Sequence, residues 1–201
     1  MDENKLISNL IQADENSFKI LVETYKGKVY NTCLGLLQNV GDAEDITQEV
    51  FVEIYLSVKN FQKKSKLSTW IFRIAITKSL DLIRRKKRKK RFSLLTNLLG
   101  EKGEILHDPV NFNHPGIEAE NKELAGILFN AISKLPESQE IAFTLNKIEG
   151  LKYQQISDIM NVSIPAIESL LFRAKQNLKK HLAKYYEELN DRKFYIKPAS
   201  K

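Results

Sequence analysis

The chain has 201 residues, 42% hydrophobic and 28% charged, which predicts one large folded domain or two small ones and excludes a wholly disordered chain. Its net charge of +7 favours an anionic partner. One uninterrupted basic run, Arg84 to Arg91, accounts for this excess, since removing its eight residues leaves 24 of the 32 basic residues against 25 acidic ones. The positive charge is therefore a single patch.

Cys33 is the only cysteine, so no internal disulfide can form, and we expect it to be a small core residue in a reducing compartment. No apolar run approaches the roughly 20 residues that a membrane-spanning helix needs. The first six residues, M-D-E-N-K-L, are polar and acidic, and no signal-type apolar core follows them. These patterns predict a soluble cytoplasmic protein.

Apolar residues recur at helical spacing through the first 90 positions, and no proline occurs before Pro109. This pattern predicts an all-helical first half. Residues 18 to 36 keep the three-and-four spacing of one long helix. We expect residues 39 to 42 to end it, with Gly41 in a left-handed conformation and Asp42 as the N-cap of the next helix.

The next predicted helix, residues 42 to 55, has two unlike sides. The inward stripe is apolar: Ile46, Val50, Phe51, Ile54, Tyr55 and Val58. The opposite side is acidic and polar: Asp45, Gln48, Glu49 and Glu53. Two interpretations of the acidic side stay open at this point. It is either a solvated face whose first-turn acids favour the helix dipole, or a docking surface for a basic partner.

A polar, basic loop then leads into a helix with Ser68 as its predicted N-cap, and this helix continues into the basic run. A polar stripe follows one side of it at three-and-four spacing: Arg73, Thr77, Asp81, Arg84, Arg85 and Arg88. A packed helix that ends in dense positive charge suits a polyanion, so we interpret it as a DNA-contacting element. Trp70, near the helix start, is either a core residue or a platform for stacking an exposed base.

Residues 93 to 120 differ in character, because they combine glycines, prolines and acidic residues, and they predict a flexible linker. Two histidines, His107 and His114, lie here without paired cysteines or carboxylates at ligand spacing. We therefore expect no metal site, and no other pattern in the chain indicates a cofactor.

A second helical unit follows the linker. Residues 124 to 135 form one predicted helix, and Pro136 opens another that Gly150 ends. Residues 153 to 160 predict a short helix, and residues 164 to 182 a longer one with Ser163 as its N-cap. The fold class expected for the whole chain is thus all-α, with two small helical domains joined by the linker.

Residues 153 to 172 fit a helix-turn-helix, which needs a small residue inside the first helix and a turn residue that tolerates positive φ; Ser157 and Asn161 qualify. The predicted inward positions are all apolar: Ile156, Met160, Val162, Ile167 and Leu170. The outward residues of the second helix would then face the major groove: Ser163, Ala166, Glu168, Ser169, Phe172 and Arg173. Arg173 can pair with guanine, whereas Glu168 can accept from cytosine but repels phosphates.

Three stretches together resemble bacterial RNA polymerase sigma factors of the extracytoplasmic-function (ECF) group of the sigma-70 family. They are D-A-E-D-I-T-Q-E-V-F from residue 42, S-T-W-I-F-R-I-A-x-x-K-S-L-D-L-I-R-R from residue 68, and L-P-E-S-Q-E from residue 135 with I-E-G-L-K-Y-Q-Q-I-S-D-I-M-N-V-S and F-R-A-K-Q-N-L after it. The resemblance implies sigma region 2 at 8–92, a linker at 93–120, sigma region 4 at 121–184 and a C-terminal tail at 185–201.

The resemblance also implies roles that spacing does not. It places a contact with the clamp helices of the largest core-polymerase subunit on Asp45, Gln48 and Glu49. It places −10 element recognition and melting on Lys63, Lys64, Lys66, Ser68, Trp70, Arg73, Thr77, Lys78, Arg84, Arg85 and Arg88. It places −35 element recognition on Ser163, Ala166, Glu168, Ser169, Phe172, Arg173 and Lys175. It further implies an anti-sigma partner, which in this group often holds the sigma factor at the inner membrane.

The chain departs from the family pattern at two places. Thr77 stands where the family usually has Asn, and residues 165 to 170 read P-A-I-E-S-L where a G-T-V-K-S-R run is usual. Two expected cations are thus Glu168 and Leu170, which leaves the −35 sequence open. The expected function is that of a promoter-specificity subunit and not of an enzyme.

Two alternatives belong to other classes of protein. A stand-alone helix-turn-helix regulator would explain the second unit but leave the acidic helix and Trp70 without a role. A DNA-processing enzyme would need Asp42, Glu44, Asp45 and Glu49 to converge on Mg²⁺, which residues on one exposed helix do not favour.

Overall fold

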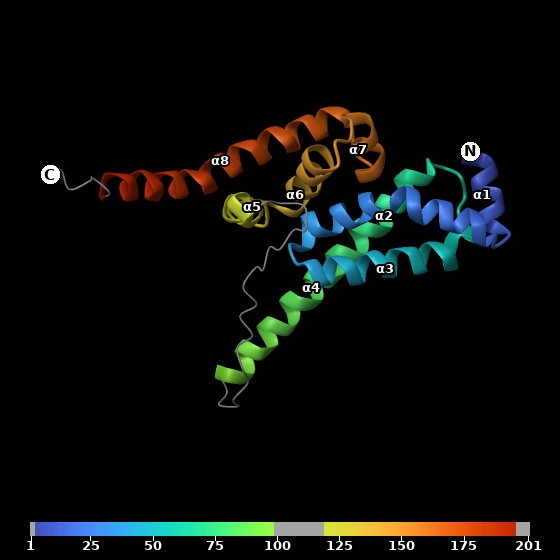
Figure 1. Ribbon diagram of the computed structural model, residues 1–201, viewed down its shortest axis with the longest axis horizontal. Coiled ribbons are helices and arrows are strands. Elements are labelled where there is room, and N and C mark those ends of the chain that lie inside the picture. Colours follow the sequence, from blue (N-terminus) through green and yellow to red (C-terminus); the bar gives the residue numbers. More distant parts are fainter. Residues whose placement is uncertain (1–2, 99–118, 196–201) are drawn as a thin grey trace.

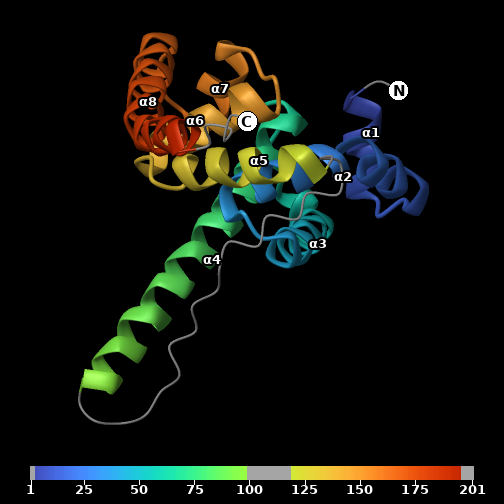
Figure 2. The same cartoon turned by 60° about the vertical axis from the view of Figure 1, so that its left-hand side comes forward.

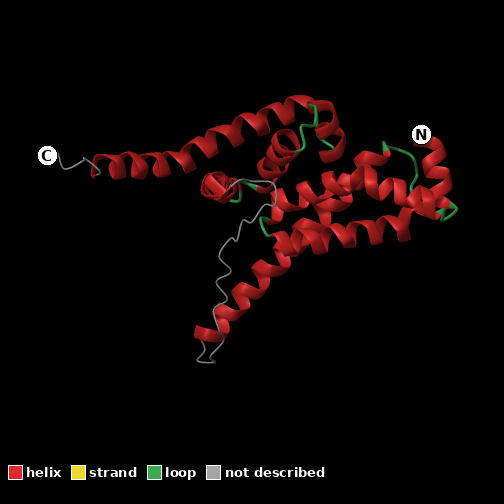
Figure 3. Cartoon of the chain, viewed as in Figure 1, coloured by secondary structure: helices red, strands yellow, loops and turns green. Residues whose placement is uncertain are grey.

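The computed structural model describes residues 3–98 and 119–195, and within these ranges it contains helices and no strand (Figure 3). The expected all-α fold class is thereby confirmed for the described part of the chain. The predicted linker lies mostly outside these ranges, as do His107 and His114.

The N-terminal unit is built from four α-helices: α1 (Glu3–Ile11), α2 (Glu15–Leu37), α3 (Val40–Ser57) and α4 (Leu67–Leu98). A short 3-10 helix, η1 (Val58–Asn60), follows α3. Apolar side chains from all of these helices form one core in which Leu21, Val29, Val50, Ile54 and Ile71 are fully buried. Cys33 is part of this core, as its surroundings in the sequence predict.

The junction between α2 and α3 differs from the expectation for Gly41 and Asp42. Gln38 takes the left-handed C-cap conformation, with φ of 54°, and Asn39 is the N-cap of α3. The Asn39 side chain accepts a hydrogen bond from the backbone N–H of Asp42 at 2.9 Å. Because the Asn39 amide satisfies this N–H, α3 begins two residues earlier than expected and Gly41 lies inside it.

The start of α4 is also capped differently. The helix begins at Leu67, and the Glu3 carboxylate of α1 accepts a hydrogen bond from the Leu67 N–H at 3.0 Å. Ser68 therefore lies in the first turn and is not the N-cap. A carboxylate from a distant segment supplies the acceptor, and its charge also suits the positive end of the helix dipole.

The C-terminal unit comprises α5 (Ala119–Ile132), α6 (Glu137–Phe143), a single π-helical turn η2 (Thr144–Ile148), α7 (Tyr153–Met160) and α8 (Ile164–Tyr195). Gly150, with φ of 66°, ends the segment after η2. The second half of α4 projects from the body of the molecule (Figure 1, Figure 2), and the far end of α8 projects as well (Figure 1). Both helices are longer than the spacing predicts, since α4 passes residue 92 and α8 passes residue 182.

The helix-turn-helix has the predicted turn. Asn161 has φ of 55°, the Ser157 hydroxyl donates to the Val162 carbonyl at 2.5 Å, and Ser163 accepts from the N–H of Ala166 at 3.4 Å. Ile156 and Ile167 are fully buried, as expected. The inward prediction was wrong for Val162, which is exposed because it follows the reversal at Asn161; Ile159 is buried instead.

The two units pack directly against each other. A second apolar core joins Leu36, Phe72, Ile76 and Leu80 of the N-terminal unit to side chains of α6, η2, α7 and α8. Gly35 of α2 lies at a close approach between them, because a Cβ atom built there would lie 2.7 Å from Cγ2 of Thr144. Glycine at this position lets η2 reach the backbone of α2.

Candidate nucleic-acid and polymerase interfaces

The acidic side of α3 is on the surface. Asp45, Gln48 and Glu49 are exposed and line a shallow hollow of about 400 Å³. Lys78 of α4 borders the same hollow, with its Nζ atom 3.8 Å from the Glu49 carboxylate and 3.7 Å from the Glu53 carboxylate. Lys78, expected from the resemblance to contact −10 DNA, is therefore grouped with the acidic helix and not with Arg73 and Thr77.

Exposed apolar side chains extend this acidic surface toward the end of α3. Val52 is 57% exposed and Leu56 is 67% exposed. The prediction that Tyr55 faces inward was wrong, because its side chain is half exposed; its ring makes an edge contact with Phe18, at 5.2 Å between ring centroids. The spacing of Glu49, Val52 and Leu56 along one face was visible in the sequence and could have shown that the surface continues.

The start of α4 presents cations around a half-buried aromatic ring. Lys63, Lys64 and Lys66 are exposed, and Lys63 has a left-handed backbone with φ of 53°. The Trp70 ring packs on Phe61 with centroids 5.0 Å apart and borders the first core, while part of it stays accessible. The core interpretation of Trp70 is thus confirmed for the side of the indole that packs on Phe61, and the base-stacking role stays a prediction.

Arg73 and Thr77 lie on the side of α4 that faces the helix-turn-helix. The Arg73 guanidinium donates from Nε to the Ile159 carbonyl at 3.1 Å and from Nη2 to the Asp158 carbonyl at 2.6 Å. These carbonyls belong to the last turn of α7, where backbone acceptors are unpaired and the helix dipole is negative. Thr77 lines a small cavity of about 290 Å³ beside them.

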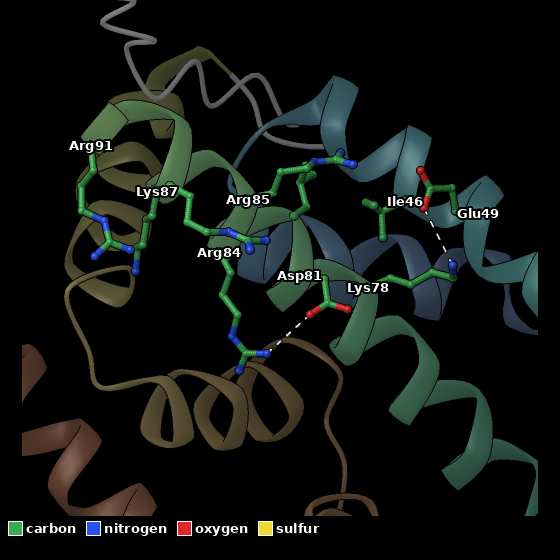
Figure 4. A pocket seen from close by; sticks show the side chains of 10 residues that line it. Ile46, Glu49, Lys78, Asp81, Arg84, Arg85, Lys87 and Arg91 are labelled. Atoms are coloured by element: carbon green, nitrogen blue, oxygen red, sulfur yellow. Dashed lines mark hydrogen bonds and ion pairs between the residues drawn. The ribbon is translucent and has the colours of Figure 1, made fainter. Parts of the chain in front are cut away.

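The basic run, Arg84 to Arg91, continues α4 without a break, and all of its residues are exposed. Figure 4 shows its cations around a hollow of about 670 Å³ between α3 and α4. Arg84 forms ion pairs with Asp81 at 3.5 Å and with Glu137 of α6 at 3.0 Å, and Lys86 pairs with Asp42. Because successive residues of an α-helix are rotated by about 100°, the cations point to all sides of α4.

The first turns of α8, the predicted recognition helix, present most of the residues expected to face outward. Exposed members are Ser163, Glu168, Phe172, Arg173 and Lys175, whereas Ala166 and Ser169 are partly covered. Phe172 is 64% exposed, an unusual solvation for a large aromatic side chain. The face therefore combines one anion, two cations and an apolar ring, a surface suited to bases and thymine methyl groups as well as to phosphates.

Two carboxyl groups at the contact between the units have raised pKa values. Burial raises the pKa of Glu140 to about 7. The negative charge of Glu137 also raises this pKa, and the positive charge of Lys87 lowers it. Burial also raises the pKa of Glu149 to about 7, although Lys28 and a hydrogen bond from Asn31 oppose it. Sequence reasoning missed both groups, because their burial depends on the docking of one unit on the other.

In the residues that the structure describes, no group of three His, Cys, Asp or Glu side chains is arranged to hold a metal ion. In the described helices, none is both long and apolar enough to span a lipid bilayer. A helix-turn-helix together with an exposed cationic helix defines a DNA-binding protein.

Comparison with known proteins narrows this class. Residues 21–89 match the family model for sigma-70 region 2, and residues 125–178 match that for sigma-70 region 4. The chain is 30% identical over 180 residues to the ECF RNA polymerase sigma factor SigW of Bacillus subtilis, covering 89% of this chain and 95% of SigW. It is 29% identical over 179 residues to the ECF RNA polymerase sigma-E factor of Haemophilus influenzae, covering 88% and 93% of the two chains. The protein belongs to the ECF group of sigma-70 family RNA polymerase sigma factors.

Solved structures share the fold at lower identity. CnrH in complex with the cytosolic domain of CnrY is similar with a TM-score of 0.65 and 18% identity, over 90% of this chain and 97% of CnrH. The sigma factor RpoE in complex with the anti-sigma factor NepR from Bartonella quintana is similar with a TM-score of 0.59 and 19% identity, over 83% and 96% of the two chains. At this identity the likeness concerns the fold.

Proposed function

We propose that this protein binds core RNA polymerase and directs it to promoters, as a specificity subunit that catalyses no reaction itself. One observation carries the proposal: a single chain of this family has both an exposed acidic helix face, on α3, and an exposed basic helix, the end of α4. An acidic helix is of no use for binding DNA, which repels it, but it suits a basic protein surface. A stand-alone regulator would need only the helix-turn-helix.

In this proposal the acidic side of α3 docks on the clamp helices of the largest polymerase subunit. Asp45, Gln48 and Glu49 are its centre, and the apolar pair Val52 and Leu56 extends it. The combination of a charged rim with exposed apolar side chains is typical of a protein–protein interface and not of a solvated helix face.

The two units would read two promoter elements. Region 2, residues 8–92, would capture the melted −10 strand at the start of α4, where Trp70 stacks a base and Arg73 and Thr77 contact neighbouring nucleotides. Arg84, Arg85 and Arg88 would hold the backbone there, and region 4, residues 121–184, would read the −35 element through α8. No promoter contact is proposed for the predicted C-terminal tail, residues 185–201, of which residues 185–195 continue α8.

An anti-sigma protein is the expected regulator, and work on polymerase would place the chain in the cytoplasm, held at the inner membrane where that regulator is membrane-bound. RpoE of Bartonella quintana and CnrH support this expectation, because their structures contain NepR and the cytosolic domain of CnrY.

The test is run-off transcription with purified core polymerase, with and without the chain, on fragments of its own genome. Promoter-specific initiation that depends on the chain is expected. If core polymerase gains no specific start on any fragment, the proposal is wrong and the stand-alone regulator becomes the better interpretation.

A double substitution tests the docking surface. Asp45→Lys with Glu49→Lys should abolish core binding in a pull-down while affinity for duplex DNA is retained. The matched control is Glu15→Lys with Glu23→Lys, which makes the same charge change at exposed positions of α2. Equal loss of core binding in both variants would show a general charge effect and contradict the assignment of α3.

A further inference from the structure

The first turns of α8 contain one acidic side chain, and the rest of this part of the helix is cationic. Among residues 164 to 186, Glu168 is the single Asp or Glu, against five lysine and arginine residues: Arg173, Lys175, Lys179, Lys180 and Lys184. Glu168 is exposed, so its carboxylate is accessible to whatever binds this face. A carboxylate repels phosphates, so its presence on a helix proposed to read DNA indicates a contact with a different DNA group.

No cation in the described part of the chain neutralises Glu168. The positions three and four residues away, which are its neighbours on the helix surface, are all apolar: Ile164, Pro165, Leu171 and Phe172. Arg173 lies about 140° around the helix, and Lys175, the next cation on the same side, lies about 10 Å along the axis. Among the described residues no ion pair engages the Glu168 carboxylate, which is therefore free to accept hydrogen bonds from a ligand.

Exposed apolar side chains border Glu168 on both sides. Ile164, one turn before it, is 36% exposed, and Phe172, one turn after it, is 64% exposed. When this face meets a groove of DNA, these two side chains displace water from around the carboxylate. A carboxylate that has lost its water is strongly destabilised unless a hydrogen-bond donor replaces it. The site therefore discriminates between base edges that offer a donor and edges that do not.

Cytosine is the base whose major-groove edge suits such a carboxylate. Guanine presents the acceptors N7 and O6, and thymine presents the acceptor O4, so both bases repel it. Adenine has a donor at N6, but the N7 acceptor lies beside this donor on the same edge. Cytosine presents its N4 amino group with no acceptor of its own, and glutamate is a usual partner of that group.

We propose that Glu168 is a specificity-determining residue of the −35 reader and selects a cytosine by accepting a hydrogen bond from its N4 amino group in the major groove. This inference rests on the proposed function of α8 at the −35 element and adds the base that one side chain reads. The contact raises specificity and not general affinity, because the same charge repels the phosphates around every site. Replacement of this cytosine should weaken binding by about 5-fold to 150-fold.

Initiation on a promoter library tests this base preference. In a promoter found by run-off transcription, every base pair of the −35 element is randomised, and each library member carries a barcode in its transcribed part. Core polymerase with the full-length chain then transcribes the library, and transcripts are counted for each sequence. At one position of the element, cytosine should exceed each other base by about 5-fold or more.

Two substitutions at the exposed Glu168 position should move this preference without disturbing the fold. Glu168→Gln supplies an amide, which pairs with N6 and N7 of adenine, and Glu168→Arg supplies a guanidinium, which pairs with N7 and O6 of guanine. Where wild type requires cytosine, these variants should favour adenine and guanine respectively, while the other positions keep their preferences. Glu187→Gln and Glu187→Arg are the matched controls, at an exposed position of the same helix about 28 Å away, and should still require cytosine.

Three outcomes separate the inference from the function on which it rests. A wild-type −35 element in which no position requires cytosine would overturn the inference. Glu168 variants that keep the wild-type preference, or that change initiation by one factor on every library member, would also overturn it, because Glu168 would then read no base. A library without any start that depends on the chain would instead remove the proposed function, and binding of the full-length chain to the same library as free duplex would then decide whether Glu168 selects cytosine.

Discussion

Replacement of Glu140 by glutamine should remove a pH-dependent loss of stability of the folded chain. Glu140 lies in the first turn of α6, is almost fully buried beside Lys87 and Glu137, and has its pKa raised from 4.5 to about 7 by that burial. The folded chain therefore binds a proton more tightly than the unfolded chain does. This carboxyl contributes no penalty below pH 4.5, and stability is lost as the pH rises toward 7.

The size of the effect follows from the pKa difference. Each unit of pKa shift corresponds to about 1.4 kcal/mol, so Glu140 should destabilise the wild-type chain by about 2 to 3 kcal/mol at pH 8 and by under about 1 kcal/mol at pH 5. Glutamine has nearly the same shape and no charge. We expect Glu140→Gln to gain stability over wild type, and this gain should grow by about 2 kcal/mol between pH 5 and pH 8.

Urea unfolding at four pH values between 5 and 8 measures this gain. Glu149 titrates in the same range, for its pKa is also about 7, so the wild-type curve contains both groups and the difference between the two curves isolates Glu140. Glu23→Gln, at an exposed position of α2, is the control and should run parallel to wild type. A gain that is flat with pH, or that shrinks as the pH rises, would refute the account of Glu140 as a buried acid.

Three further predictions concern other parts of the molecule. Trp70→Ala should cost about 2 kcal/mol in urea unfolding through lost packing on Phe61, and in permanganate footprinting it should impair strand opening more than closed-complex formation. The slope of log affinity for duplex DNA against log salt should be about −3.6, for about four contacts, because only one side of the helical basic run can face a duplex; a slope near −7 would mean that all eight cations bind. Asn161→Ala should lower the stability by about 1 kcal/mol because φ is 55° there, while Asn161→Gly should change it by less than about half as much in the same assay.

The features that the sequence predicts well are those in which neighbouring residues decide the outcome. Asn161 and Ser163 set the turn of the helix-turn-helix through their own backbone and hydroxyl, and both behave as expected. The core helices likewise follow from the spacing of apolar residues alone. The all-α fold and its N-terminal and C-terminal helical units could therefore be predicted.

The features that the sequence does not predict depend on distant segments. Ser68 is a good N-cap by type, yet Glu3, 64 positions away, supplies the acceptor for α4. Tyr55 fits an apolar stripe, but nothing covers its outer side in the described helices. The partners of Arg73 are backbone carbonyls of a helix 85 residues further along, and no side-chain pattern encodes a carbonyl acceptor.

The length of α8 has a mechanical meaning. Its 32 residues run without a break from the recognition turn at Ile164 to Tyr195, a rod of about 48 Å. A rigid rod acts as a lever: a tilt of about 10° at the recognition end displaces the other end by about 8 Å, and the reverse holds equally. A protein bound to the far end of α8 could therefore reorient the residues proposed to read the −35 element without approaching them, so such a regulator would not need to compete for the promoter.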